Sequence, residues 1–333
     1  MNTESPGGAD APAPHPDEVL LDGPWTHRLV HVRGQRLHVA ECGASSSPLV
    51  LFIHSATGGW FDWRRVLPLL TDLPVHAVAV SLRGYGTSDR TPSGYRPNAA
   101  ADDAAGLIRA LGHSRAIVVG QGYGALVAWT LAARAPKLVA GVVSCGMPHP
   151  VAWRREVLRR PFSPPFRASW TLGKYARAVG RLRGGRRSAS GVVTDAMKLA
   201  GPGFADTPDG IESARLMERS LLAGALSPAL QHLEWLAAPT GPSWRRWMRV
   251  LSRAPMPPSW IVVGAGDPLV DVGTADAGAA DGSRTGDGRI VDASHTAGAV
   301  TLPGIGHYPA LEAPDEVAEI VVEAVHREHP ELI

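Results

Sequence analysis

Two residues near the carboxyl end of the sequence, Asp267 and His307, have the side chains that acid–base chemistry requires. Asp267 lies in Gly264-Ala-Gly-Asp-Pro268, His307 ends Gly304-Ile-Gly-His307, and each stretch follows a short apolar run. A single Asp-Pro or Gly-His pair is more often a turn. If both runs are strands of one parallel sheet, however, both loops lie at its carboxyl edge. There a carboxylate can fix the tautomer of an imidazole and stabilise its protonated form, so the pair predicts a general base.

A third stretch, Ala116-Ile-Val-Val-Gly-Gln-Gly-Tyr-Gly-Ala-Leu-Val-Ala-Trp-Thr130, predicts a strand that turns sharply into a helix. Glycines occupy alternate positions in this turn, at Gly120, Gly122 and Gly124. The middle position of such a turn holds its side chain at the tip, where a nucleophile can act. Glycine has no side-chain atom that can attack, so Gly122 excludes ordinary covalent catalysis at this position.

The elements that must position these residues alternate along the chain. Residues 28–32 and 36–40 predict a hairpin, and strand-length apolar runs occur at residues 49–54, 75–81, 138–145, 259–264 and 299–302 and from residue 116 onward. Apolar residues at helical spacing occur at residues 60–72, 98–111 and 314–327 and after the glycine turn. This alternation favours an α/β fold with a mostly parallel, eight-stranded sheet and helices on both faces.

Residues 151–258 follow a different pattern, with prolines, arginines and five tryptophans but no clear strand. They predict a mostly helical lid inserted into an α/β core of residues 21–150 and 259–333, preceded by a disordered tail of residues 1–20. Residues 274–297, rich in Ala, Gly and Asp, predict a flexible loop. Residues 151–190 carry ten Arg and Lys174 against only Glu156, which favours a solvated basic face over an anion-binding lid.

Composition narrows the classes of function. A chain of 333 residues with 44% hydrophobic residues can bury a large core. A formal net charge of +2 gives no global reason to expect nucleic acid or a membrane as partner, so we expect only a small-molecule substrate or ligand. The two cysteines, Cys42 and Cys145, show no disulfide or metal pattern, and no cofactor or metal is expected. The amino terminus has no signal-peptide pattern, which predicts a cytoplasmic protein; the oligomeric state is left open.

With these motifs, the chain resembles the α/β-hydrolase superfamily, and within it the lidded epoxide-hydrolase-like and haloalkane-dehalogenase-like enzymes. The resemblance covers about residues 24–321 and rests on four stretches: Leu51-Phe-Ile-His54 with Trp60-x-x-Trp63, Leu82-Arg-Gly-Tyr-Gly-x-Ser-Asp89, the glycine turn, and the pair of Asp267 and His307 loops. It implies the α/β-hydrolase fold. It also implies that Asp267 is the triad acid, His307 the triad base and Gly122 the nucleophile position.

The sequence departs from the family pattern at the nucleophile and in the oxyanion loop. The family has Asp or Ser at the tip of the elbow, where this chain has Gly122. The loop that usually reads His-Gly-x-Pro in epoxide hydrolases is His54-Ser-Ala-Thr57, without the proline. Backbone N–H groups remain available there, and those of Ser55 or Ala56 together with that of Tyr123 can polarise a carbonyl or bind an anion.

Phenol groups are scarce in the predicted lid. Epoxide hydrolases use a pair of lid tyrosines to activate the ring oxygen, whereas only Tyr175 lies between residues 151 and 258. Tyr85 and Tyr123 are alternative phenol donors, although each is more often a packed aromatic residue. The further pocket residues that we expect are His54, Gln121, Met147 and Tyr175.

Three functions remain open from the sequence. In the first, His307 oriented by Asp267 is a general base on water or on an acidic proton of a small, largely apolar organic substrate, with no covalent intermediate. Non-covalent hydrolysis, lyase, cyclase and cofactor-free oxygenase reactions fit this description. The second is a catalytically inactive pseudo-hydrolase that binds a small ligand. In the third, Gly122 is an introduced substitution in an ordinary epoxide hydrolase or esterase.

Overall fold

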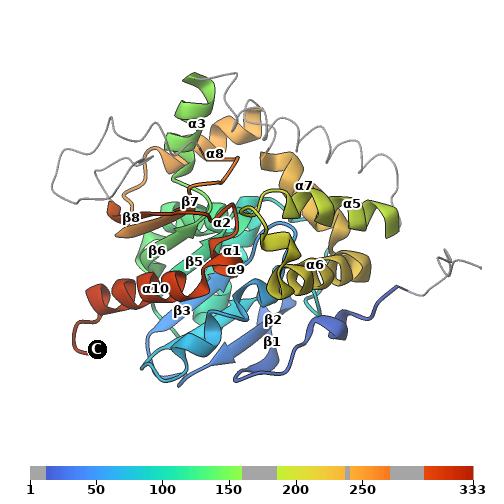
Figure 1. Ribbon diagram of the computed structural model, residues 1–333. Helices are drawn as coiled ribbons and strands as arrows, with labels where there is room; N and C mark the ends of the chain where they lie inside the picture. The colour runs from blue at the N-terminus through green and yellow to red at the C-terminus, as the bar shows by residue number, and fades with distance from the viewer. Residues whose placement is uncertain (1–12, 160–185, 237–240, 271–295, 333) are drawn as a thin grey trace, which may run out of the picture.

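The computed structural model describes residues 13–159, 186–236, 241–270 and 296–332 (Figure 1). Its centre is an eight-stranded sheet, as predicted, in the order β1-β2-β4-β3-β5-β6-β7-β8. The strands are β1 (Thr26–Val32), β2 (Gln35–Cys42), β3 (Leu49–Ile53), β4 (His76–Val80), β5 (Ala116–Gln121), β6 (Val139–Cys145), β7 (Ser259–Gly264) and β8 (Thr296–Leu302). Strand β2 is antiparallel to β1 and β4, and the remaining pairs are parallel.

Burial explains the sequences of these strands. Every residue of β3, β4, β5, β6 and β7 is buried, which is why these strands read as continuous apolar runs. The edge strand β1 buries Val30 and Val32 but exposes the residue between them. The hairpin turns at Arg33 and Gly34, whose φ angles of 51° and 80° suit a tight two-residue turn.

Helices flank the sheet (Figure 1). Helix α1 (Pro97–Ala110) packs against α2 (Tyr123–Arg134), and α10 (Pro314–Glu328) packs against β5, β6 and β7. Gly112, just after α1, has a φ of 87°, the left-handed conformation expected of a glycine at a helix end. A short helix, α9 (Pro309–Glu312), precedes α10. The predicted α/β architecture is therefore confirmed.

Two predictions in the amino-terminal half are wrong. The helix expected over residues 60–72 is instead two 3-10 turns, η2 (Trp60–Trp63) and η3 (Leu67–Leu70), because Pro68 lacks the N–H that a continuous helix needs. The tail expected over residues 1–20 is also too long. Residues 16–19 form a 3-10 turn, η1 (Pro16–Val19), which buries Val19 and accepts a hydrogen bond from Trp60 Nε1 at its carbonyl oxygen.

The described residues between β6 and β7 form helices and no strand. These elements are α3 (Pro150–Arg159), α5 (Arg186–Met197), η5 (Phe204–Asp206), α6 (Pro208–Ser220), the π-helical turn η6 (Leu221–Ala225), α7 (Leu226–Leu236) and α8 (Pro242–Leu251). Helices α3, α5, α7 and α8 lie above the sheet in Figure 1. Trp153, Trp244 and Trp247 are buried, so these tryptophans are packing residues, whereas Trp170 lies outside the described residues. None of the described helices is long and apolar enough to cross a bilayer.

Candidate active site

The structure brings Asp267 and His307 together at the ends of neighbouring strands. Asp267 follows β7 and His307 follows β8, and Nδ1 of His307 lies 2.9 Å from Oδ2 of Asp267. The other carboxylate oxygen accepts a hydrogen bond from the Leu269 N–H at 2.8 Å, which fixes the carboxylate. Because the carboxylate is the acceptor, the ring proton is assigned to Nδ1, and Nε2 is the free, basic nitrogen.

The surroundings of His307 increase its basicity. Burial lowers the pKa of His307, but the negative charge of Asp267, its hydrogen bond and the charge of Glu312 together outweigh burial. The pKa of His307 is therefore raised above its ordinary value. A stronger base accepts a proton more readily from a weak acid such as water.

Gly122 lies at the tip of the turn between β5 and α2, as predicted. Its φ of 53° and ψ of −107° are rarely adopted by other residues. The flanking glycines are required by close packing, since a Cβ atom would lie 2.4 Å from backbone atoms at Gly120 and 2.0 Å from the Ile53 carbonyl oxygen at Gly124. At Gly122 a Cβ atom would lie 3.1 Å from Nε2 of His307, so the free nitrogen faces this position.

The backbone donors near Gly122 differ from the prediction in one respect. The N–H of Ser55 donates to Oδ2 of the buried Asp62 at 2.9 Å, so it is not available to a substrate oxygen. Asp62 belongs to η2, which lies close enough to this loop for its carboxylate to reach the Ser55 N–H. Ala56 and Tyr123 remain as candidate donors; Tyr123 opens α2, where the first N–H groups have no acceptor within the helix.

A small cavity adjoins these groups. Its lining includes Ser55, Ala56, Tyr123 and His307 from the sheet side, together with side chains of α5 and α7. Its volume is about 50 Å³, which is room for only a few water molecules. The free nitrogen of His307, the turn at Gly122 and the helices above the sheet therefore meet at one enclosed point.

Three of the predicted pocket residues hold the framework instead. His54 accepts a hydrogen bond from the Leu82 N–H at Nε2 (3.0 Å) and donates from Nδ1 to the Ser55 carbonyl (2.7 Å). Gln121 donates to the His307 carbonyl oxygen at 2.7 Å and so supports the loop of the base. Met147 is buried and its carbonyl oxygen accepts a hydrogen bond from Ser144 Oγ. The fourth predicted residue, Tyr175, lies outside the described residues.

The phenols of Tyr85 and Tyr123 are already engaged. Tyr85 donates to the Ala56 carbonyl oxygen at 2.6 Å, and Tyr123 donates to the Tyr95 carbonyl oxygen at 3.2 Å. Burial raises the pKa of both phenols well above the ordinary value. His232 of α7, which sequence reasoning missed, stacks on the Tyr123 ring at 3.8 Å and contacts the Tyr85 hydroxyl at 3.0 Å. These aromatic residues are therefore a packed support beneath the loop of residues 54–57.

Sequence reasoning also missed Tyr308 and Glu312. Tyr308 lines the cavity beside His307. The Glu312 carboxylate accepts hydrogen bonds from the N–H groups of Gly306 and Tyr308, both at 2.9 Å, and of Gly201 at 2.7 Å. It thus holds the chain on both sides of His307. The only signal in the sequence was their short distance from His307. A glutamate two residues before a proline, however, is typical of the region where a helix begins.

The chain is similar to known proteins of one family. Residues 50–320 match the family model described as "Alpha/beta hydrolase family". "Epoxide hydrolase 1" of Caenorhabditis elegans is 33% identical over 158 residues, which are 47% of this chain and 38% of that protein. "Epoxide hydrolase A" of Mycobacterium tuberculosis (strain ATCC 25618 / H37Rv) is 26% identical over 329 residues, covering 90% of this chain and 97% of that protein.

The first curated relatives are matched over only part of their length, between 38% and 50% of each protein. Among solved structures, an epoxide hydrolase from Bacillus megaterium has a TM-score of 0.67 at 22% identity, covering 90% of this chain and all of that one. An epoxide hydrolase from an endophytic Streptomyces has a TM-score of 0.61 at 21% identity, covering 94% and 98%. At these identities the likeness supports the fold alone.

Proposed function

Because the chain belongs to the alpha/beta hydrolase family, we propose that it is an epoxide-hydrolase-like enzyme in which His307 is the base and no covalent intermediate forms. One observation carries this proposal. Nε2 of His307 faces Gly122 at 3.1 Å from where a Cβ atom would be, yet Gly122 has no side chain. A water molecule at this point is a group that the base can deprotonate. The relatives named epoxide hydrolase support a small epoxide as the substrate.

The proposed step uses groups that lie around the cavity. Water transfers a proton to Nε2 of His307 while its oxygen bonds to a ring carbon and the ring C–O bond breaks. Asp267 stabilises the imidazolium that results. The imidazolium returns its proton to the former ring oxygen, so one epoxide and one water become one diol. The N–H groups of Ala56 and Tyr123 and the hydroxyl of Tyr308 are the candidate donors for the developing negative oxygen.

The size of the cavity bears on the substrate. Ligand pockets usually measure roughly 300 Å³ or more, whereas this cavity measures about 50 Å³. A substrate of ordinary size fits only if side chains such as Leu199 and Leu233, which line the cavity, move aside. The missing side chain at Gly122 keeps a second candidate function open, a pseudo-hydrolase that binds a small ligand without turnover.

The main test compares three proteins on a panel of small epoxides: the unaltered chain, His307→Gln, and His326→Gln as a matched control on the exposed face of α10. We expect diol formation to fall by about 10²–10⁴-fold in His307→Gln and to be unchanged in the control. A single turnover in water enriched in the heavy oxygen isotope should place the label in the first diol formed. An unlabelled first product indicates an enzyme ester and contradicts the mechanism.

The alternatives are separated by substitutions at the turn. If the panel yields no product with the unaltered chain, but a bound ligand is recovered intact, the pseudo-hydrolase is supported. Gly122→Asp and Gly122→Ser test the third reading, in which Gly122 replaces a native nucleophile. Activity on epoxides, haloalkanes or esters that appears only in these variants supports that reading. Lyase, cyclase and oxygenase reactions are assayed with the same His307→Gln comparison, with and without oxygen.

A further inference from the structure

Helix α8 divides its residues sharply between two sides. The buried side, which packs against α2 and α3, consists of Trp244, Trp247, Met248 and Leu251. The other side is exposed and carries the residues that we call the arginine face: Arg245, Arg246, Arg249 and Arg253, the last of which lies just beyond the helix. The buried tryptophans anchor the helix against α2 and α3, so the four arginines extend from one exposed side.

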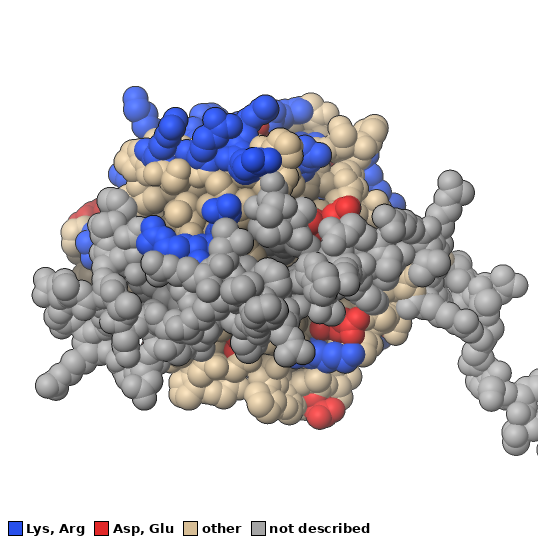
Figure 2. Space-filling view, turned by 90° about the horizontal axis from the view of Figure 1, so that it is seen from above, with Lys and Arg blue, Asp and Glu red and all other residues tan. Residues whose placement is uncertain are grey.

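Three of these arginines border an open hollow of about 480 Å³ between α8 and the end of α2. The lining consists of Arg246, Arg249 and Arg253 together with Ala133, Val250 and Ala254. Val250 is 38% exposed among the guanidinium groups. Seen from above, Lys and Arg side chains gather along one border of the molecule and are open to solvent there (Figure 2).

The arginine face lacks partners among the described residues, since none of its members forms an ion pair with another residue of that part of the chain. Other exposed arginines do form such pairs: Arg36 with Asp89 and Arg134 with Asp102, each at 2.8 Å. Arg245 and Arg249 are four residues apart on the helix, where like charges repel each other. An external anionic partner would relieve this repulsion.

We propose that the arginine face docks on a membrane surface that carries anionic phospholipids. Clusters of at least four arginines or lysines attract such surfaces, and an exposed aliphatic side chain among them suits the boundary between headgroups and acyl chains. The net charge of +2 predicts no membrane partner for the chain as a whole. Electrostatic attraction is screened beyond about 10 Å at ordinary salt, however, so the local surface decides.

The composition of the hollow favours a membrane over other polyanions. Sites for a free phosphate add directional donors such as backbone N–H groups or hydroxyls, whereas the other side chains at this hollow are alanine and valine. Sites for single-stranded nucleic acid add exposed aromatic residues for stacking, whereas Trp244 and Trp247 are buried. This inference does not depend on the chemistry proposed for His307.

Sedimentation of the full chain with lipid vesicles tests the proposal. We expect binding to vesicles of phosphatidylglycerol mixed with phosphatidylcholine, none to pure phosphatidylcholine, and release at high salt. The triple variant Arg246→Glu, Arg249→Glu, Arg253→Glu should bind about a hundredfold or more weakly. The triple variant with Lys at the same positions should bind nearly as well as the unaltered chain. Circular dichroism of each variant verifies that it folds, and single Arg249→Glu serves if the triple change does not.

The matched control carries the same three changes to Glu at exposed arginines away from α8: Arg109 of α1, Arg115 just before β5 and Arg215 of α6. It should retain binding. The proposal is overturned if the unaltered chain ignores anionic vesicles, if the control loses binding equally, or if the Lys variant loses binding. Direct binding of pyrophosphate or of single-stranded DNA, with no binding to vesicles, would also overturn the proposal and would assign the hollow to a free phosphate ligand or to nucleic acid.

Discussion

At the scale of single residues, the charge of Asp267 sets the basicity of His307. A base works in its neutral form, so activity should fall as the pH drops through the pKa of His307, which is raised above its ordinary value. Asp267→Asn removes the charge but keeps the burial, which lowers the pKa. The acidic limb of the kcat/KM profile should therefore move to lower pH, with a reduced maximum because the imidazole loses its orientation.

Asp267→Asn should also change how the stability of the fold depends on pH, because Asp267 raises the pKa of His307. Because the folded state raises the pKa of His307, protonated His307 stabilises the fold below its unfolded pKa, and this contribution is lost as the pH rises through the folded pKa. Asp267→Asn should abolish this gain at low pH. Asp315→Asn, at an exposed position of α10, is the control. An unchanged acidic limb in Asp267→Asn would show that the two residues do not act together.

Glu312 is the second residue that controls His307, through the backbone. Its carboxylate holds the N–H groups on both sides of His307 and that of Gly201 from the helical segment. Glu312→Gln should cost about 1–3 kcal/mol of unfolding free energy, since hydrogen bonds to a charged acceptor weaken. It should also lower the pKa of His307, as the charge of Glu312 raises it. Urea unfolding and a histidine NMR titration measure the two effects independently of any activity.

The control for Glu312 is Glu319→Gln, which removes an exposed carboxylate from α10. It should leave both the stability and the pKa of His307 unchanged. If Glu312→Gln destabilises the protein without moving the pKa, Glu312 is a structural residue only. If neither quantity changes, the hydrogen bonds of Glu312 to the His307 loop do not contribute measurably to stability.

At the scale of elements, the oxyanion loop and the turn η2 are joined by one buried carboxylate. Oδ2 of Asp62 accepts the Ser55 N–H, while Oδ1 has no partner among the described residues. Burial is the largest influence on this group and raises the pKa of Asp62 from 3.8 to about 6, against the opposing hydrogen bonds to Ser55 and Gly59 and the charge of Arg64. Ionised Asp62 is therefore unfavourable in the folded state.

Asp62→Asn should remove this pH-dependent cost. With a folded pKa above the unfolded one, the protonated form favours folding, so stability falls as the pH rises from about 4 to above about 6. The difference corresponds to about 3 kcal/mol. Burial lowers the pKa of His54 to about 4, so this group also affects stability near this range. The quantity to measure is therefore the difference in unfolding free energy between the variant and the unaltered chain at each pH. A difference that stays constant over this range would refute the prediction.

The strands could be predicted from the sequence because burial on both faces demands continuous apolar runs, as in β3 and β5. The two 3-10 turns within residues 60–72 could not be predicted from the apolar pattern. The apolar spacing is helical, and the effect of Pro68 on the backbone competes with that pattern. The positions of Gly122 and Gly112 in the sequence were enough to predict the sharp turn and the helix end where the structure has positive φ angles.

The dyad of Asp267 and His307 was predictable because both residues follow strands, so their meeting depends only on the order of the sheet. The loss of the Ser55 N–H was not predictable, because it depends on how η2 folds back to bring Asp62 to the loop. The roles of Gln121 and Glu312 were missed for a similar reason. Each acts on backbone groups of the His307 loop, and backbone partners leave no signature in the sequence of side chains.

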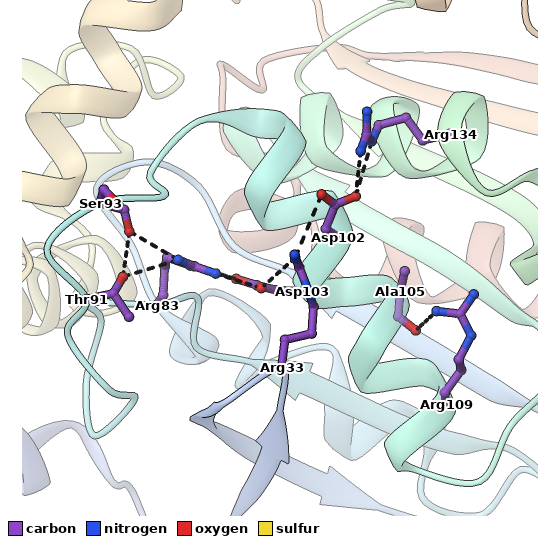
Figure 3. A network of polar contacts seen from close by, with 9 residues as sticks. All are labelled: Arg33, Arg83, Thr91, Ser93, Asp102, Asp103, Ala105, Arg109 and Arg134. Atoms are coloured by element: carbon purple, nitrogen blue, oxygen red, sulfur yellow. Dashed lines mark hydrogen bonds and ion pairs between the residues drawn. The ribbon is translucent and has the colours of Figure 1, made fainter.

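At the scale of the whole molecule, a charged network ties the amino-terminal strands to the helix that begins at the glycine turn (Figure 3). Arg83 makes two hydrogen bonds of 2.7 Å to Asp103 of α1, whose side chain is 2% exposed. Arg33, at the hairpin turn, contacts Asp103 at 3.3 Å and the neighbouring Asp102 at 3.8 Å. Asp102 in turn pairs with Arg134 at the end of α2. The network therefore joins the hairpin turn, the loop after β4, α1 and the carboxyl end of α2.

Removing Arg83 should test how much this network contributes. Arg83→Met leaves the Asp103 carboxylate buried without its main partner, which should cost about 3–5 kcal/mol of unfolding free energy. Burial already raises the pKa of Asp103 and Arg83 opposes this, so the loss should grow as the pH rises above about 4, the ordinary pKa of an aspartate. Arg36→Met, which breaks the exposed pair with Asp89, should cost far less, because exposed ion pairs contribute little to stability. Urea unfolding measures both costs. Adding Asp103→Asn to Arg83→Met should recover part of the lost stability, because it removes the unpaired charge. Equal costs for Arg83→Met and Arg36→Met would mean that the network is no stronger than a surface pair.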